Sequence, residues 1–365
     1  MKTLWPEHGG RTSVISSMLE QKGIHSKKVQ DFSANINPFG IPSIMIEAMQ
    51  EAITKQIIYY PDLTYREHTE KVASYERVEK NQVLLTNGGA EAIHLSAALF
   101  KGKKVALLHP SFSEYELACK AHDVKYTCFL YEEFWNTCKL PINVEEIIVD
   151  YDAVYICRPN NPSGTCVSFE EMERLIKLAK MHHTYVIVDE AFIHFAHNER
   201  SVVSLCHSNP HLIVLRSLTK IFAVPGIRLG FMIGSEATIK RATELQVPWS
   251  INAVALSLID CLQKCQDFVD ETVAYITQEK EWLATQLDAL DFQMSNTSTN
   301  FYLLRDPSLD DHEPLLLFLA ERGILSRHTY NFKGLEGKAL RFAIRTHEEN
   351  ERIVRYLKEW RERIC

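Results

Sequence analysis

The 365-residue chain has few of the features that mark secreted or membrane-spanning proteins. Its nine cysteines are odd in number and contain no C-x-x-C pair, and the segment Met1-Lys-Thr-Leu-Trp-Pro-Glu-His8 has no apolar core of a signal peptide. No apolar run approaches the roughly 18 residues that suggest a membrane span. These absences predict a cytoplasmic protein with reduced thiols and no membrane association.

The chain also lacks a surplus of basic residues. Its 40 Lys and Arg stand against 47 Asp and Glu, a formal net charge of −7, so we expect no nucleic-acid partner, because neutralising phosphates requires a basic excess. The fifteen histidines are scattered. Two neighbouring pairs, His182 with His183 and His194 with His197, have no carboxylate or cysteine at ligand spacing. We therefore expect no metal site.

What the chain does have is an alternation of strand-length apolar runs and helical patterns. Strands are expected at 83–86, 104–109, 154–157, 185–188 and 212–215, with helices after Asn87 and at 111–122 and 169–182. This alternation predicts an α/β fold whose large domain has a mostly parallel sheet with helices on both faces. Ligands of such sheets bind at the carboxyl ends of the strands.

The pattern changes towards the carboxyl terminus. Long helices are expected over about 253–290, and then an α+β segment with strands at 300–305, 324–328 and 339–344 and helices at 313–322 and 348–364. We therefore predict three parts: an N-terminal arm (1–45) that joins a small domain, a large domain (46–250), and the small α+β domain (251–365).

One lysine stands out at the end of an expected strand. Lys220 follows the apolar run that ends at Arg216, with Ser217 before it and Arg228 after a Pro-Gly turn. A lysine at the lip of a buried strand can lose its proton by desolvation and form a Schiff base. A hydroxyl and a guanidinium beside it suit a phosphate group. Taken alone, however, a lysine after a strand is more often the solvated end of a loop.

Three other signals precede Lys220 at strand ends. Asn87-Gly-Gly-Ala90 opens a helix and offers free backbone N–H groups to an anion. Asn161 lies in an Asn-Pro turn, and Asp189 follows an apolar strand. The ordinary alternatives are a turn for Asn161 and a helix cap or surface carboxylate for Asp189. Together, a phosphate site, an amide, a carboxylate and a lysine suit pyridoxal 5′-phosphate as cofactor.

Short motifs along nearly the whole chain carry a family resemblance. They are His8-Gly-Gly10, Phe32-Ser-Ala-Asn-Ile-Asn-Pro38, Tyr60-Pro-Asp62, Pro159-Asn-Asn-Pro-Ser-Gly164, Asp189-Glu-Ala-Phe192, Arg216-Ser-Leu-Thr-Lys220, Pro225-Gly-Ile-Arg-Leu-Gly230, Pro248-Trp-Ser-Ile-Asn-Ala253 and Leu340-Arg-Phe-Ala-Ile-Arg345. They resemble the fold-type-I pyridoxal-phosphate enzymes. Within these, the chain is similar to the L-threonine-O-3-phosphate decarboxylases of cobalamin biosynthesis, close relatives of the histidinol-phosphate aminotransferases.

The resemblance implies a set of cofactor contacts. Lys220 would form the Schiff base and carry protons, Asp189 would pair with the pyridinium nitrogen, and Asn161 would donate to the phenolic oxygen. Phe112 would stack on the ring, although an aromatic residue after a strand is more often part of the core. The cofactor phosphate would be held by the Gly89 and Ala90 amides, Ser217, Arg228 and Tyr60 of the partner subunit. This last contact implies a homodimer with shared active sites.

The resemblance also implies substrate contacts for a small phosphorylated amino acid. Arg341 would hold the α-carboxylate in a bidentate fork, with Asn161 nearby. Arg327 would hold the substrate phosphate, together with His8, Gly9 and Asn35. An arginine in a terminal strand is otherwise a solvated edge residue, and Asn35 is otherwise a turn residue.

The implied reaction is decarboxylation of L-threonine O-3-phosphate to (R)-1-amino-2-propanol O-phosphate and CO₂, for the cobalamin nucleotide loop. Phe192 stands where aminotransferases of this group commonly have tyrosine, as it does in the decarboxylase branch. Two alternatives stay open: a histidinol-phosphate-type aminotransferase, and a non-catalytic protein that keeps the fold as a binding module. The intact set of Lys220, Asp189, Asn161 and Arg228 argues against the second.

Overall fold

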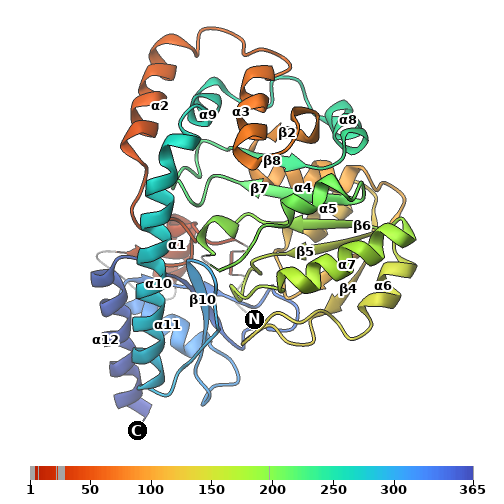
Figure 1. The fold of residues 1–365 in the computed structure, drawn as a ribbon. Helices are drawn as coiled ribbons and strands as arrows, with labels where there is room; N and C mark the ends of the chain where they lie inside the picture. The colour runs from red at the N-terminus through yellow and green to blue at the C-terminus, as the bar shows by residue number, and fades with distance from the viewer. Residues whose placement is uncertain (1–4, 7, 22, 24–28, 197, 365) are drawn as a thin grey trace.

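A seven-stranded sheet forms the centre of the computed structural model, which describes residues 5–6, 8–21, 23, 29–196 and 198–364 (Figure 1). The spatial order of the strands is β2-β8-β7-β6-β5-β3-β4. All of them run parallel except β8, which is antiparallel to both of its neighbours. The strands are β2 (Val83–Thr86), β3 (Lys104–His109), β4 (Lys125–Leu130), β5 (Ala153–Cys157), β6 (Tyr185–Asp189), β7 (Leu212–Ser217) and β8 (Gly230–Ile233).

Helices cover both faces of this sheet. Successive side chains of a strand point to opposite faces, so in β6 Val186 and Val188 join one apolar cluster and Ile187 joins another. The cluster around Ile187 is covered by α4 (Gly88–Ala98), α5 (Glu114–Ala121) and α8 (Glu236–Leu245). The opposite cluster includes α3 (Arg66–Glu76), α6 (Val144–Asp150), α7 (Phe169–His182), α9 (Ala253–Ile259) and α10 (Gln266–Asp288). The predicted large-domain fold is thereby confirmed.

Helix α7 illustrates how the local sequence determines where a helix begins and ends. Ser168 caps its amino terminus by accepting a hydrogen bond from the Glu171 N–H at 3.1 Å. The helix ends at His182, and the next residue, His183, has a left-handed φ of 58° that stops the helical pattern. Between these ends, apolar side chains recur at helical spacing and are buried against the sheet. The predicted bounds of 169 and 182 are the observed ones.

A second, smaller sheet is built mostly from the carboxyl-terminal residues. Its order is β12-β13-β10-β9, and all pairs are antiparallel. Helices α11 and α12 belong to the same region, at the lower end of the molecule in Figure 1. The elements are β9 (Gln293–Met294), β10 (Phe301–Arg305), β12 (Arg327–His328), β13 (Leu340–Ala343), α11 (Glu313–Glu321) and α12 (His347–Ile364).

The N-terminal arm joins this smaller region. Strand β1 (Gln30–Asp31) pairs in parallel with β11 (Ile324–Leu325), and Ile15 and Leu19 of α1 (Thr12–Gln21) cluster with Ala320 and Leu325. Helix α2 (Ser43–Lys55) leads into the large region, where it contacts α9. The domain boundaries near residues 45 and 250 stay predictions.

Short 3₁₀ segments complete the elements: η1 (Lys80–Gln82), η2 (Ile193–Phe195), η3 (Val202–His207) and η4 (Leu262–Cys265).

Several elements differ from the sequence prediction. Strands β4 and β8 were not predicted, and the single strand expected at 324–328 is two strands in different sheets. The helix expected from 111 begins at Glu114, and the helices expected over 253–290 are interrupted by η4.

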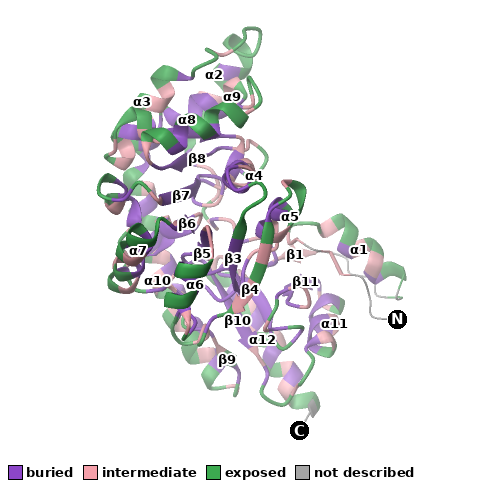
Figure 2. Ribbon diagram, turned by 90° about the vertical axis from the view of Figure 1, so that its right-hand side faces the viewer, coloured by how far each residue is buried: buried purple, intermediate pink, exposed green. Residues whose placement is uncertain are grey.

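None of the helices that the structure describes is long and apolar enough to cross a membrane. In Figure 2 most strands of the large sheet are buried, whereas the helices around them also carry exposed residues.

Candidate active site

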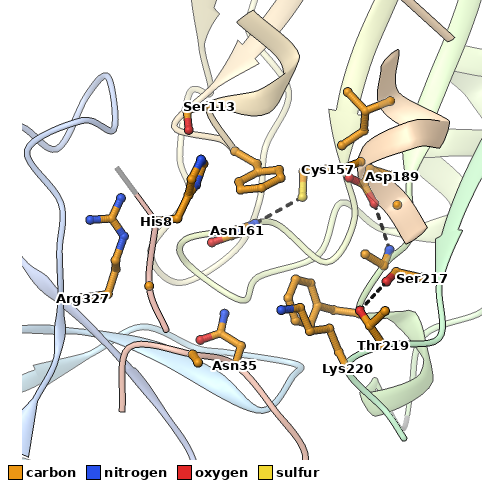
Figure 3. A pocket seen from close by; sticks show the side chains of 18 of the residues that line it. His8, Asn35, Ser113, Cys157, Asn161, Asp189, Ser217, Thr219, Lys220 and Arg327 are labelled. Carbon is orange, nitrogen blue, oxygen red and sulfur yellow. Dashed lines mark hydrogen bonds between the residues drawn. The ribbon is translucent and has the colours of Figure 1, made fainter. Parts of the chain in front are cut away.

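A pocket opens at the carboxyl ends of the parallel strands, between the large sheet and the smaller one (Figure 3). It brings together segments from the arm, from five strand ends and from the small sheet. Of the predicted site residues, only Tyr60 is absent from its lining. Those that line it are His8, Gly9, Asn35, Gly89, Ala90, Phe112, Asn161, Asp189, Ser217, Lys220, Arg228, Arg327 and Arg341.

Asp189 supplies a buried carboxylate at the end of β6. Its Oδ2 accepts a hydrogen bond from the Tyr115 hydroxyl at 2.7 Å, and its Oδ1 accepts one from the Ala191 N–H at 3.0 Å. Burial raises the pKa of Asp189, whereas these two bonds oppose the rise. The carboxylate is therefore held in one orientation, with its charge available to a cationic group of a ligand.

Tyr115 is a functional residue that the sequence did not reveal. It lies on α5, fully buried, with its ring stacked on Tyr155 at 5.4 Å and perpendicular to Phe112 at 6.1 Å. Sequence periodicity marks it only as an apolar position of a helix. Its hydrogen bond to Asp189 depends on how α5 packs against β6.

Lys220 follows β7 and has no carboxylate within ion-pair distance among the described residues. Burial, and then the positive charges of Arg341 and Arg228, lower the pKa of Lys220 to about 8. A substantial fraction of the amine is therefore neutral near physiological pH. A neutral amine in a pocket is the nucleophile that Schiff-base chemistry requires.

A cradle for an anion lies beside Lys220, at the start of α4. Arg228 lies so close over Gly88, which has φ of 75°, that a Cβ at position 88 would be 2.6 Å from the guanidinium Nη2. The Ser217 hydroxyl lies 2.8 Å from that of Thr219, and both side chains line the pocket. Free backbone N–H groups at a helix start, a guanidinium and hydroxyls together suit a phosphate. Thr219 was not predicted, although its place between Ser217 and Lys220 could have indicated it.

Two arginines lie side by side on neighbouring strands of the small sheet. Arg327 on β12 is directly opposite Arg341 on β13, and both are nearly fully buried. Like charges directly opposite are destabilising, so this pair favours an anion between or beside them. Arg341 donates to Asn161 Oδ1 and, at 2.8 Å, to the Ser33 carbonyl, while its Nε has no hydrogen-bond partner among the described residues. Burial and the charge of Arg327 lower the pKa of Arg341 to about 9.

The arm contributes two polar side chains to the pocket. Asn35 is buried, and its Oδ1 has no hydrogen-bond partner among the described residues. The His8 Nε2 lies 2.9 Å from Glu114 Oε1 of α5, and the His8 ring lies 5.7 Å from that of Phe112. Glu114 was not predicted. Through this contact Glu114 attaches the arm to helix α5, and His8 itself lies in the pocket (Figure 3).

Two residues lie away from the pocket. Tyr60 is 84% exposed, with its ring 5.1 Å from that of Trp249, so it does not contribute to the site of its own chain. Arg345 pairs with Glu349 through two nitrogen–oxygen contacts of 3.1 and 2.9 Å. Neither residue lines the pocket, and the predicted role of Tyr60 across a subunit boundary stays a prediction.

Known proteins resemble this chain over nearly its full length. A threonine-phosphate decarboxylase of Salmonella typhimurium is 30% identical over 96% of this chain and 95% of its own. A protein of Caldanaerobacter subterraneus subsp. tengcongensis, provisionally named as a threonine-phosphate decarboxylase, is 34% identical over 89% of this chain and 88% of its own. The histidinol-phosphate aminotransferase structure from Clostridium acetobutylicum is 31% identical, with a TM-score of 0.84 over 91% of this chain and 99% of its own.

The family assignment follows from a family model that matches most of the chain. Residues 27–357 match the family Aminotransferase class I and II, a span that includes the lysine, the carboxylate, the anion cradle and both arginines. The pocket fits the cofactor of that family, since it offers a lysine amine of lowered pKa, a buried carboxylate and a phosphate cradle in one place. The chain therefore belongs to the class I and II aminotransferase family of pyridoxal-phosphate-dependent enzymes.

Proposed function

We propose that this enzyme decarboxylates L-threonine O-3-phosphate to (R)-1-amino-2-propanol O-phosphate and CO₂, for the nucleotide loop of cobalamin. The observation that carries the proposal is the buried arginine pair, Arg327 and Arg341, in the same pocket as Lys220. Two guanidinium groups match a small amino acid that carries both a carboxylate and a phosphate. The names of the two similar decarboxylases support the same substrate class.

The cofactor would be held by residues that the pocket already orients. The Gly89 and Ala90 N–H groups, with Ser217 and Arg228, would bind its phosphate. Asp189 would hold the proton on the ring nitrogen, Asn161 would donate to the phenolic oxygen, and Phe112 would cover the ring. Pyridoxal phosphate, when bound, supplies an electron sink that stabilises negative charge developing at the substrate Cα.

The chain's own residues would then select and protonate the substrate. Arg341 would fix the α-carboxylate, and Arg327 would fix the phosphate together with His8, Gly9 and Asn35. This two-point attachment sets which Cα bond is oriented for cleavage. Lys220 would deliver a proton to Cα after CO₂ leaves, because its lowered pKa allows it to gain and lose a proton near neutral pH.

Phe192 lines the pocket without a hydroxyl and packs edge-on against Phe301 at 4.8 Å. The position that carries a tyrosine hydroxyl in related aminotransferases is thus apolar here. The second candidate is a histidinol-phosphate-type aminotransferase, because the Clostridium acetobutylicum structure is as similar as the decarboxylases. This candidate requires a 2-oxo acid to accept the amino group.

The deciding experiment is a product assay on cofactor-loaded protein with L-threonine O-phosphate and no 2-oxo acid. We expect catalytic release of CO₂ and of the amino-alcohol phosphate. Product that forms only when 2-oxoglutarate and an amino donor are both supplied would instead establish an aminotransferase. A protein that binds pyridoxal phosphate but turns over neither substrate set would establish a binding module.

We also propose that the enzyme is a homodimer with shared sites. Large apolar side chains are exposed together around Tyr60, at Ile57, Ile58, Tyr59, Leu63, Val247 and Trp249. Exposed apolar clusters of this kind mark protein interfaces. Pairing of two chains through this surface would cover it and bring Tyr60 of the partner subunit towards the cofactor phosphate. Sedimentation analysis should show a dimer, and Tyr60→Ala should weaken cofactor binding.

The lowered pKa of Lys220 predicts how cofactor loading depends on pH. The rate at which apoprotein becomes covalently linked at Lys220 should rise with pH and level off above about 8, because the neutral amine reacts. Borohydride trapping followed by peptide mass analysis measures this rate. A profile that still rises between pH 9 and 10, as roughly expected for an ordinary lysine, would contradict the assigned pKa.

Tyr115→Phe should raise the pKa of Asp189 and lower kcat. The substitution removes a hydrogen bond to a charged carboxylate, an interaction worth about 1.5–3 kcal/mol. The acidic limb of the kcat–pH profile should therefore move to higher pH. Tyr155→Phe is the matched control, since this buried tyrosine bonds Ser96 rather than Asp189. Equal profiles for the two variants would show that the Tyr115 hydroxyl does not act through Asp189.

A further inference from the structure

We propose that His109, Glu116 and Cys128 form a binding site for a transition-metal dication such as zinc. The three residues come from the end of β3, from α5 and from β4, and their ligand atoms all lie within 4.8 Å of one another. Figure 2 shows these three elements side by side. Short sequence spacing does not indicate this cluster, because the fold brings residues from three different elements together. None of them lines the pocket.

His109 is the strongest argument for a ligand at this place. Its side chain is only 2% exposed, yet neither ring nitrogen has a hydrogen-bond partner among the described residues. The Nε2 atom points towards the cluster, 3.6 Å from Glu116 Oε1, which is beyond hydrogen-bond length. A buried polar group without a partner is destabilising. Coordination of a metal by Nε2 would give this nitrogen a partner.

Lys333 occupies the position that a metal ion would take. Its Nζ lies 2.9 Å from both Cys128 Sγ and Glu116 Oε1, and its side chain is half exposed. The ammonium supplies one positive charge beside a carboxylate and a thiol, whereas a dication would balance a carboxylate and a thiolate fully. Lys333 itself is exposed, although Phe332 and Leu335 on the same loop are buried, so its flexible side chain can turn into solvent while the loop stays packed. The ammonium and the metal ion therefore compete for one place.

The ligand set selects the class of metal. One sulfur, one imidazole nitrogen and one carboxylate oxygen suit zinc, while magnesium and calcium prefer oxygen ligands alone. Water would complete a four-coordinate site. The Tyr126 hydroxyl donates to the other oxygen of Glu116 at 3.1 Å and thereby orients this carboxylate from outside the ligand shell.

A bound metal would act on the active site through its neighbours. His109 precedes the segment that carries Phe112, and Glu116 follows Tyr115, the partner of Asp189. Coordination of both His109 and Glu116 would hold the segment between them, which carries Phe112 and Tyr115, in a fixed position next to the cofactor pocket. It would also release Lys333 and so loosen the attachment of Phe332, which lines the pocket from the small region. The metal would be a structural and positioning element rather than a reactant.

The test is metal binding to the cofactor-loaded enzyme after treatment with a chelator. We expect one zinc ion per chain by equilibrium dialysis, and cobalt should give the visible bands of a four-coordinate site with a thiolate ligand. Cys128→Ser and Glu116→Gln should each weaken binding at least tenfold, an effect of the size that metal-site substitutions cause. Lys333→Met should tighten binding, because it removes the competing ammonium.

Cys166→Ser is the control, since this cysteine lies outside the cluster and should leave the affinity unchanged. Loss of affinity in Cys128→Ser with a gain in Lys333→Met establishes the site. Three outcomes would overturn it: no zinc retained by the wild-type enzyme, equal affinities for Cys128→Ser and Cys166→Ser, or weaker binding in Lys333→Met.

Discussion

Lys220→Ala should lower kcat by about 10³-fold or more, since proton transfer by a positioned side chain alone contributes roughly 10²–10⁴-fold. The variant also loses the amine that links cofactor and protein, and among the residues that the structure describes Lys220 is the one lysine that lines the pocket. CO₂ release from L-threonine O-phosphate measures the effect. The Asp189 carboxylate and the cradle at α4 remain, so the variant should still bind pyridoxal phosphate, but without a covalent link.

Lys240→Ala controls for the loss of a lysine elsewhere. Lys240 is exposed on α8, on the outer surface of the large sheet's helix layer, and should retain full activity. Circular dichroism and cofactor content should be the same for both variants. Turnover by Lys220→Ala within tenfold of the wild-type rate would mean that another group carries the proton and that the proposed role is wrong.

Arg341→Lys should lower kcat/KM by an amount equivalent to about 2–5 kcal/mol, the range for disrupting a buried hydrogen-bonded charge contact. The guanidinium reaches Asn161 and the Ser33 carbonyl at the same time, and its Nε has no partner in the part of the chain that the structure describes. A lysine ammonium cannot present parallel N–H groups to a carboxylate. Steady-state kinetics with L-threonine O-phosphate measures the loss.

Arg345→Lys is the matched control for this substitution. Arg345 lies just beyond the same strand but pairs with Glu349 outside the pocket, so its replacement should change kcat/KM little. Because the two variants make the same chemical change four residues apart, equal losses would indicate a general defect of the small sheet. Only a selective loss in Arg341→Lys supports carboxylate binding.

Elements whose residues show a clear apolar pattern were predictable from the sequence. The strand at 104–109 and the helix at 169–182 have the predicted bounds, since one is a short apolar run and the other carries a serine cap and a helical apolar stripe. Strand β4 was missed because it is an edge strand with no fully buried residue. Strand β8 was missed because it has only four residues, begins with a glycine, and is defined by its pairing with β2 on one side and β7 on the other.

The site was predictable to the extent that its residues lie at strand ends. Parallel strands place Asn161, Asp189 and Lys220 at one edge of the sheet, and the motifs around them define the family. Tyr115 and Glu114 could not be found in this way. Their partners, Asp189 and His8, are distant in sequence, and both contacts exist because α5 packs between the sheet and the arm.

The sequence by itself determined the alternating α/β architecture, the family, the cofactor and the residue types of the site, because apolar periodicity and strand-end motifs are local properties of the chain. Only the tertiary structure decided the opposition of Arg327 and Arg341, the hydrogen bond that orients Asp189, and the cluster of His109, Glu116 and Cys128. Strand register and helix packing set these arrangements, and both depend on contacts between residues far apart in the sequence.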